Sequence, residues 1–135
     1  MKPAVLFLAA FSLIAGCSGE SGPELYYVSG TVSYTGKPLA DGYVTFVGDD
    51  ASDTTQGALV HVGEIVNGKF EGRVSAGKKR VEIYGSYDTG RMVPDEMGDK
   101  EIPERGGIPA QYNSETTLEV TIPQGGMKDL VFDLE

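Results

Sequence analysis

The stretch ALVHVGEIVNGKFEGRV, residues 58–74, decides the fold. Two runs of alternating residues flank the dipeptide Asn67-Gly68, which readily adopts the positive φ angles of a tight type I′ turn. The pattern therefore predicts a β-hairpin whose strands cover residues 58–66 and 69–74.

Short alternating runs of the same kind continue on both sides of this hairpin. Further strands are predicted over residues 26–34, 42–47, 79–85, 116–122 and 127–134. The 19 glycines and 7 prolines suit turns and oppose helix interiors. About seven short strands at this spacing predict an all-β fold, an antiparallel sandwich.

Alternation also selects the side chains expected to fill the core. In the first hairpin strand it favours Val62 as inward-facing and places the single histidine, His61, on the opposite, solvated face. Lys79 shares a face with Val81, and we expect its ammonium group to reach solvent at the end of the sandwich. The complete inward set is Val28, Val32, Val44, Phe46, Val60, Val62, Phe70, Val74, Val81, Ile83, Leu118, Val120, Ile122, Leu130, Phe132 and Leu134.

The N-terminal segment predicts export. A charged start precedes an apolar run over residues 4–14, and the small residues Ala15-Gly16 then precede Cys17. This is the pattern of a secretory signal peptide, and the run is shorter than the ~20 residues that span a membrane comfortably. An ordinary cleaved signal and an uncleaved membrane anchor remain alternatives.

The segment LIAGC, residues 13–17, resembles the lipobox of bacterial lipoproteins. The resemblance implies cleavage before Cys17, a diacylglyceryl group on its sulfur and acylation of the new amine. Ser18 stands where an aspartate would imply retention in the inner membrane, so the resemblance implies the outer membrane, facing the periplasm or cell surface. The chain then divides into a signal peptide (1–16), a lipidated cysteine with a flexible tether (17–24) and a domain (25–135).

Several motifs of the domain follow one pattern: VSGTV (28–32), TGKPLA (35–40), YVTF (43–46), NGKF (67–70), AGKKRVEI (76–83) and IPAQYN (108–113). Together they resemble carboxypeptidase regulatory-like domains, which are Ig-like, transthyretin-like Greek-key β-sandwiches. The resemblance covers most of the chain after residue 25. It implies an adhesive, spacer or accessory module of an exported protein.

The composition excludes several function classes. The formal net charge of −9 disfavours nucleic acid, because phosphate is repelled. With Cys17 carrying lipid, no thiol remains for a disulfide, a thiolate nucleophile or a zinc site. One histidine, no Gly-x-Ser-x-Gly elbow and no phosphate loop predict that the domain is not an enzyme.

Two acidic clusters are candidate cation sites. The first is Asp49, Asp50 and Asp53, and the second is Asp95, Glu96, Asp99, Glu101 and Glu104. Clustered loop carboxylates suit calcium, although neither cluster has EF-hand spacing. A calcium-stabilised adhesion or sensor module is therefore one alternative function, and a carboxylate-based hydrolase is another. No other cofactor is predicted.

Residues 86–111 are predicted to form a long irregular stretch. Loops of this length are uncommon in compact domains and are often functional. We expect partial order, with Met92-Val93, Ile102 and Ile108 docked on a sheet edge. The leading hypothesis is a lipid-anchored, non-enzymatic envelope module for protein binding, adhesion or spacing. Its candidate contacts with an unknown envelope protein are Tyr87, Arg91, Met92, Met97 and Ile102.

Overall fold

The computed structural model describes residues 23–48 and 60–135. These residues form nine strands, one short 3₁₀ turn and no α-helix, which confirms the all-β prediction. The elements are β1 (Leu25–Tyr34), β2 (Lys37–Pro38), β3 (Asp41–Gly48), β4 (Val60–Val66), β5 (Lys69–Ser75), β6 (Gly77–Pro94), β7 (Glu101–Gly107), η2 (Ala110–Tyr112), β8 (Glu119–Ile122) and β9 (Met127–Leu134).

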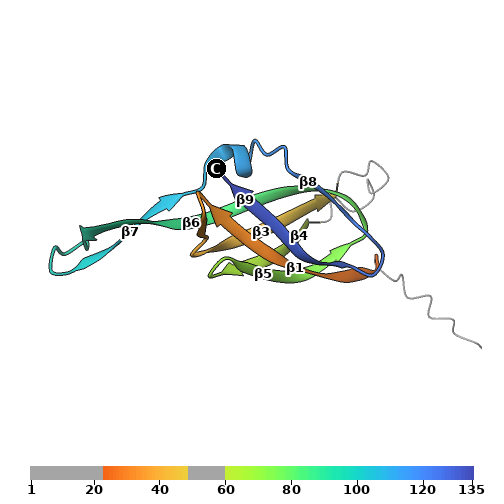
Figure 1. Ribbon diagram of the computed structural model, residues 1–135, viewed down its shortest axis with the longest axis horizontal. Coiled ribbons are helices and arrows are strands. Elements are labelled where there is room, and N and C mark those ends of the chain that lie inside the picture. Colours follow the sequence, from red (N-terminus) through yellow and green to blue (C-terminus); the bar gives the residue numbers. More distant parts are fainter. Residues whose placement is uncertain (1–22, 49–59) are drawn as a thin grey trace, which may run out of the picture.

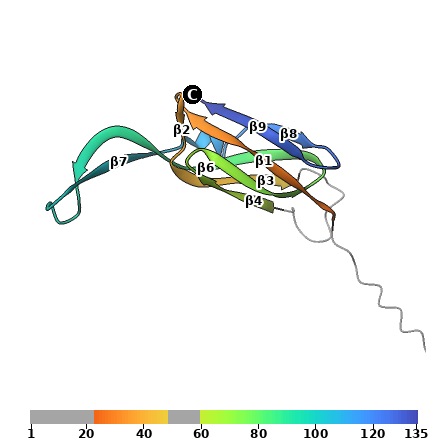
Figure 2. The ribbon, with the colours of Figure 1, turned by 60° about the horizontal axis from the view of Figure 1, so that its bottom comes forward.

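The strands form one hydrogen-bonded sheet that curls into a sandwich of two layers (Figures 1 and 2). One layer contains β4, β3, β6 and β8, and the other contains β5, β1, β9 and the short β2. All pairings are antiparallel except that of β1 with β9, which is parallel. The layers join through the β4–β5 hairpin, where only Ile65↔Phe70 and Val66↔Lys69 are in register.

The turn of this hairpin has the predicted geometry. Asn67 and Gly68 both have positive φ, 50° and 75°, as a type I′ turn requires. The Gly68 amide donates to the carbonyl of Leu39 (2.7 Å), and the Gly68 carbonyl accepts from the Val32 amide (2.8 Å). The turn is therefore tied to β1 and to the β2–β3 connection as well as closing its own hairpin.

The core lies between the two layers. The Phe70 ring packs 6.2 Å from Phe46 and 6.0 Å from Phe132, measured between centroids, and so links the layers. Apart from Leu39 and Ile65, every fully buried apolar residue belongs to the predicted inward set. The buried residues are Val28, Val32, Leu39, Val44, Phe46, Ile65, Phe70, Val74, Val81, Ile83, Ile122 and Leu134, with Leu118, Val120, Leu130 and Phe132 half-buried against them.

The predicted facing of β4 is wrong. Val62 is 58% exposed, whereas Ile65 is 1% exposed. The register places His61 opposite Phe46, so His61, Gly63 and Ile65 share the inner face. The inner face of β4 carries only one large apolar residue, Ile65, whereas Val62 and Val66 point outward. Alternation therefore predicted the face with more apolar residues as the inner one. The side chain of Val60 lies outside the described residues.

The predicted irregular stretch is also wrong. Strand β6 runs through to Pro94 and pairs with β7, so a two-stranded ribbon extends away from the sandwich (Figures 1 and 2). The register shifts between Asp88 and Met92, and Gly90 has a positive φ of 81° within this bulge. The bulge and the prolines interrupt the alternation on which strand prediction depends.

Candidate functional site

We define the arm as residues 88–105, the part of the β6–β7 ribbon that leaves the sandwich (Figure 2). Every residue of the arm is exposed or only partly buried. The arm therefore has no core of its own, and its conformation depends on its base, on side-chain contacts between its strands and on its terminal turn.

The base of the arm is anchored to the sandwich by aromatic packing. The Tyr87 ring covers Gly106, where an added Cβ would lie 2.4 Å from a ring carbon. Tyr87 also packs against Tyr34 of β1, with 4.6 Å between the two ring centroids. Arg105 adds an ion pair to Asp41 on β3, with 3.3 Å between Nη1 and Oδ2.

A polar clamp joins the two strands of the arm at the bulge. The Thr89 hydroxyl and Arg91 Nε each donate to Glu104 Oε2 at 2.8 Å. The hydrogen bond from Thr89 and the nearby guanidinium hold the pKa of Glu104 below its ordinary value, against an opposing effect of desolvation. Glu104 is therefore ionised at neutral pH and bridges both partners.

The tip of the arm is an ordered turn. The Asp95 amide donates to the Lys100 carbonyl (2.7 Å), and the Gly98 amide donates to the Asp95 carbonyl (2.9 Å). The Asp95 carboxylate accepts from the Asp99 amide at 3.0 Å. This turn presents Met97 with 86% of its surface exposed.

Apolar side chains lie on both faces of the arm. Val93 pairs with Ile102, and Met92 pairs with Pro103 one position away. Because directly opposed residues share a face and successive residues alternate, the two pairs lie on opposite faces. Met92 is 54% exposed and Ile102 is 45% exposed.

The arm contains four of the residues predicted to contact a partner: Arg91, Met92, Met97 and Ile102. The fifth, Tyr87, is half-buried at the base and packs within the sandwich. The expected docking of Met92 and Ile102 on a sheet edge is wrong, because a ribbon carries them away from the body. Ile108 does pack against the core.

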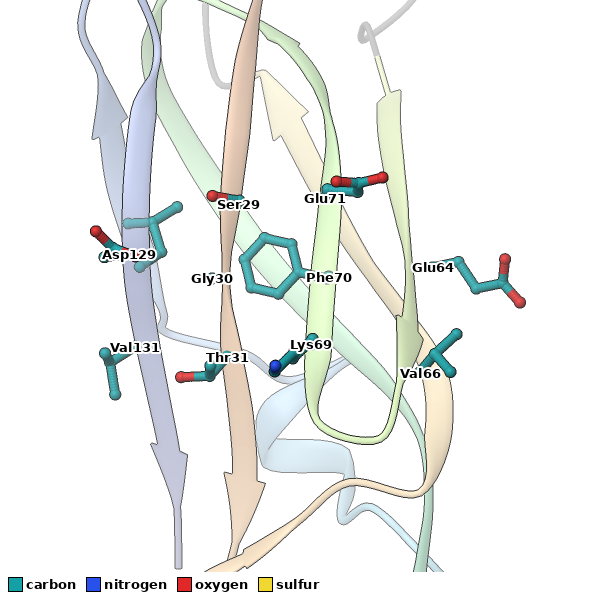
Figure 3. A pocket seen from close by; sticks show the side chains of 11 residues that line it. Ser29, Gly30, Thr31, Glu64, Val66, Lys69, Phe70, Glu71, Asp129 and Val131 are labelled. Carbon is teal, nitrogen blue, oxygen red and sulfur yellow. The ribbon is translucent and has the colours of Figure 1, made fainter.

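A groove that sequence reasoning missed crosses the outer face of β9, β1, β5 and β4. Its volume is about 790 Å³. Figure 3 shows Asp129 and Val131 on one side and Glu64 and Val66 on the other, with β1 and β5 between them. No pattern along the sequence could have found it, because its lining comes from four strands brought together by pairing.

The chemistry of this groove is mixed. Ser29 and Thr31 contribute hydroxyls and Lys69 an ammonium group, while Glu71 is already occupied by a hydrogen bond from Tyr27 (2.9 Å). Its lining combines positive and negative side chains with apolar ones, and these polar groups do not gather around one point. The groove therefore defines a surface without a reactive centre.

A polar cluster lies inside the sandwich where β4, β5 and β6 meet. Lys79 Nζ donates to Ser75 Oγ at 2.9 Å, and His61 Nε2 lies 3.3 Å from the same oxygen. The expectation that Lys79 reaches solvent is wrong, because it is only 4% exposed. The predicted face of His61 is wrong too, since His61 lies opposite Phe46 on the inner face of β4, where it is half-buried.

These three groups resemble an activated nucleophile in composition. Burial lowers the pKa of His61 below its ordinary value, and the Lys79 ammonium lowers it further, so the imidazole is neutral at pH 7. A neutral imidazole beside a hydroxyl is the arrangement of a base and a nucleophile. Ser75, however, is only 6% exposed, and the groove described above includes none of the three residues.

The lipidation residue and the first cation candidate lie outside the described residues. These are Cys17 and the trio Asp49, Asp50 and Asp53. The second acidic cluster is spread along the arm. Within residues 23–48 and 60–135, no group of three or more histidine, cysteine or acidic residues is arranged to hold a metal ion.

No family model, curated protein or solved structure matches this chain. In the described part of the chain, no helix is long and apolar enough to cross a membrane.

Proposed function

We propose that this chain is a non-enzymatic, lipid-anchored β-sandwich module of the bacterial cell envelope that binds a protein partner through its arm. The observation that carries the proposal is the arm itself, a ribbon that leaves the sandwich and exposes Met92, Met97 and Ile102 by 45–86%. The motifs that resemble carboxypeptidase regulatory-like domains agree with an accessory or adhesive role.

The arm exposes apolar surface that a partner would cover. An isolated two-stranded hairpin is at best marginally stable in water. This one is held by a clamp, an ordered turn and an aromatic base, while its apolar side chains face solvent. Grouped exposed apolar residues on a soluble domain are typical of interaction sites.

The absence of catalysis is part of the proposal. Among the described residues, His61, Ser75 and Lys79 come nearest to a catalytic constellation, and the hydroxyl that would attack is buried. We assign this cluster to the interior of the sandwich, where each polar group satisfies another.

The arm is tested by shortening it. Asp88 and Arg105 already pair across the ribbon, so replacing residues 89–104 with Asn-Gly recloses it with a two-residue turn. In detergent extracts of the host envelope, we expect the full chain to migrate in a complex and the shortened chain to migrate alone. A complex of unchanged abundance with the shortened chain contradicts the proposal, provided that both chains unfold at the same denaturant concentration.

The anchor is tested separately. The segment LIAGC predicts that the chain takes up a radioactive fatty acid in cells and that Cys17→Ala abolishes the label. Lipid chains acting together make release from the bilayer negligible, because each buried methylene contributes about 0.8 kcal/mol. An unlabelled wild-type chain in the culture medium would refute the anchor and leave the arm experiment unaffected.

A further inference from the structure

We infer that the arm enters an apolar cleft of a partner protein, that the inner end of this cleft, which receives the tip, is basic, and that Met97 leads the insertion. This inference rests on the proposed function, because it specifies the partner for which the arm is built. Four features of the arm carry it: apolar residues on both faces, unpaired carboxylates near the tip, prolines in both strands and a preformed turn.

The apolar residues require a partner with two walls. A ribbon that lies on a flat surface needs apolar side chains on one face only. Here the Val93–Ile102 pair lies on one face and the Met92–Pro103 pair on the other. Covering both faces at once requires a cleft, which removes both apolar pairs from water.

The charges near the tip require basic residues at the end of the cleft that receives it. Asp95, Glu96, Asp99 and Glu101 stand against a single cation, Lys100. Among the described residues, Glu96, Asp99 and Glu101 have no side-chain hydrogen bond or ion pair. Three unpaired carboxylates that enter the cleft beside Met97 favour arginine and lysine on the partner at the inner end of the cleft, and they steer its approach.

The same charges argue against two other occupants. A second copy of this chain would bring one acidic tip against a body of the same net sign, since the formal charge is −9. An anionic lipid surface would repel the tip for the same reason, because like charges oppose association. A protein of the opposite charge is the occupant that the tip complements.

The prolines argue against addition of a strand to the ribbon. Strand β7 is the last strand of the sheet path and has a free edge. Pro103 removes a donor from that strand, and Pro94 removes one from β6. Proline on an edge strand blocks pairing with another chain, so recognition falls to side chains.

The tip is suited to lead the insertion. Its turn is already formed by bonds of Asp95 to Gly98, Asp99 and Lys100, so little order remains to be gained on binding. Met97 is the most exposed apolar side chain of the described residues, at 86%. Its unbranched thioether adapts to an irregular pocket.

Photocrosslinking of the full chain in its host cells tests this inference. The variant Met92→p-benzoylphenylalanine places the probe on one face of the arm. We expect a single protein adduct whose crosslinked partner peptide is apolar and is flanked by lysine or arginine. Adding Met97→Ser should reduce the adduct about tenfold, the effect of removing a central anchor.

Charge is tested with two matched triple variants. Glu96→Gln, Asp99→Asn and Glu101→Gln neutralise the tip, and we expect about a tenfold loss of adduct. The matched control for charge combines Glu64→Gln, Glu115→Gln and Asp129→Asn on the sandwich. The control for the methionine is Met127→Ser, also on the sandwich. Each control should change the adduct less than twofold.

The outcomes separate the two proposals. No adduct from position 92, and none from a probe placed at position 97, refutes the proposed function together with this inference. An adduct that is insensitive to the tip variants, or that maps to an acidic peptide, overturns the basic cleft and leaves partner binding standing. An adduct with a second copy or with lipid overturns the choice of occupant.

Discussion

The inward facing of Ile65 gives the sharpest test of the fold, because sequence alternation predicted Val62 instead. We consider the same replacement, threonine, at both positions of β4. Threonine keeps the β-branch, so the strand preference is unchanged and only the environment differs. Ile65 is 1% exposed and Val62 is 58% exposed.

The expected magnitudes follow from these exposures. Ile65→Thr removes a buried methylene, which costs about 0.5–1.5 kcal/mol as in Ile→Val changes. It also buries a hydroxyl, which costs about 1–3 kcal/mol when no partner is available. The sum is about 3 kcal/mol, or about 12 °C in Tm at ~4 °C per kcal/mol. Val62→Thr should stay within about 0.5 kcal/mol, as surface substitutions do.

Urea unfolding of residues 23–135 measures both variants, with tyrosine fluorescence as the probe because the chain has no tryptophan. Equal m-values would confirm that the variants differ in stability and not in the surface exposed on unfolding. If Val62→Thr lost about 2 kcal/mol or more and Ile65→Thr lost almost nothing, β4 would face the other way, and the position of His61 inside the sandwich would be wrong as well.

Three other predictions concern stability. Burial and the Lys79 ammonium lower the pKa of His61 in the folded chain, so at pH values near and below its ordinary pKa of 6.5 the unfolded chain binds more protons than the folded chain. Stability should therefore fall as the pH drops from 7.5 to 5.5, and His61→Gln should flatten that dependence in urea titrations. At Gly126 (φ 86°) a Cβ would lie 2.1 Å from a backbone oxygen of β1, whereas at Gly125 (φ 100°) nothing lies within 4 Å; Gly126→Ala should therefore cost about 2 kcal/mol more than Gly125→Ala, and equal midpoints would contradict this packing. Replacing residues 89–104 with Asn-Gly should change the unfolding free energy by less than about 1 kcal/mol, because no residue of that segment is buried; a larger loss in calorimetry would show that the arm supports the sandwich.

The sandwich was predictable from sequence wherever a strand has one apolar face. In β3, Val44 and Phe46 are buried as alternation predicts. The turn at Asn67-Gly68 was predictable too, because the required φ angles restrict which residues can occupy it. Strand β4 was misread because both of its faces carry apolar residues and one inner position is Gly63, which lies close to β5.

The arm shows where sequence reasoning lost the site. The candidate contacts on the arm were named from residue type alone, inside a stretch predicted to be irregular. The bulge at Gly90 and the proline at 103 break the period of two, although the strands still pair. Pairing is a contact between segments, and no pattern within one segment reports it.

The amino-acid sequence by itself determined the class of fold, the central hairpin turn and most of the core, because each depends on local preference or on the hydrophobicity of neighbouring residues. Only the tertiary structure decided which way β4 faces, that Lys79 and Ser75 meet inside the sandwich, and that residues 88–105 leave it as an arm. Those features depend on strand register and on packing between distant segments, whose energies do not appear until the strands are brought together.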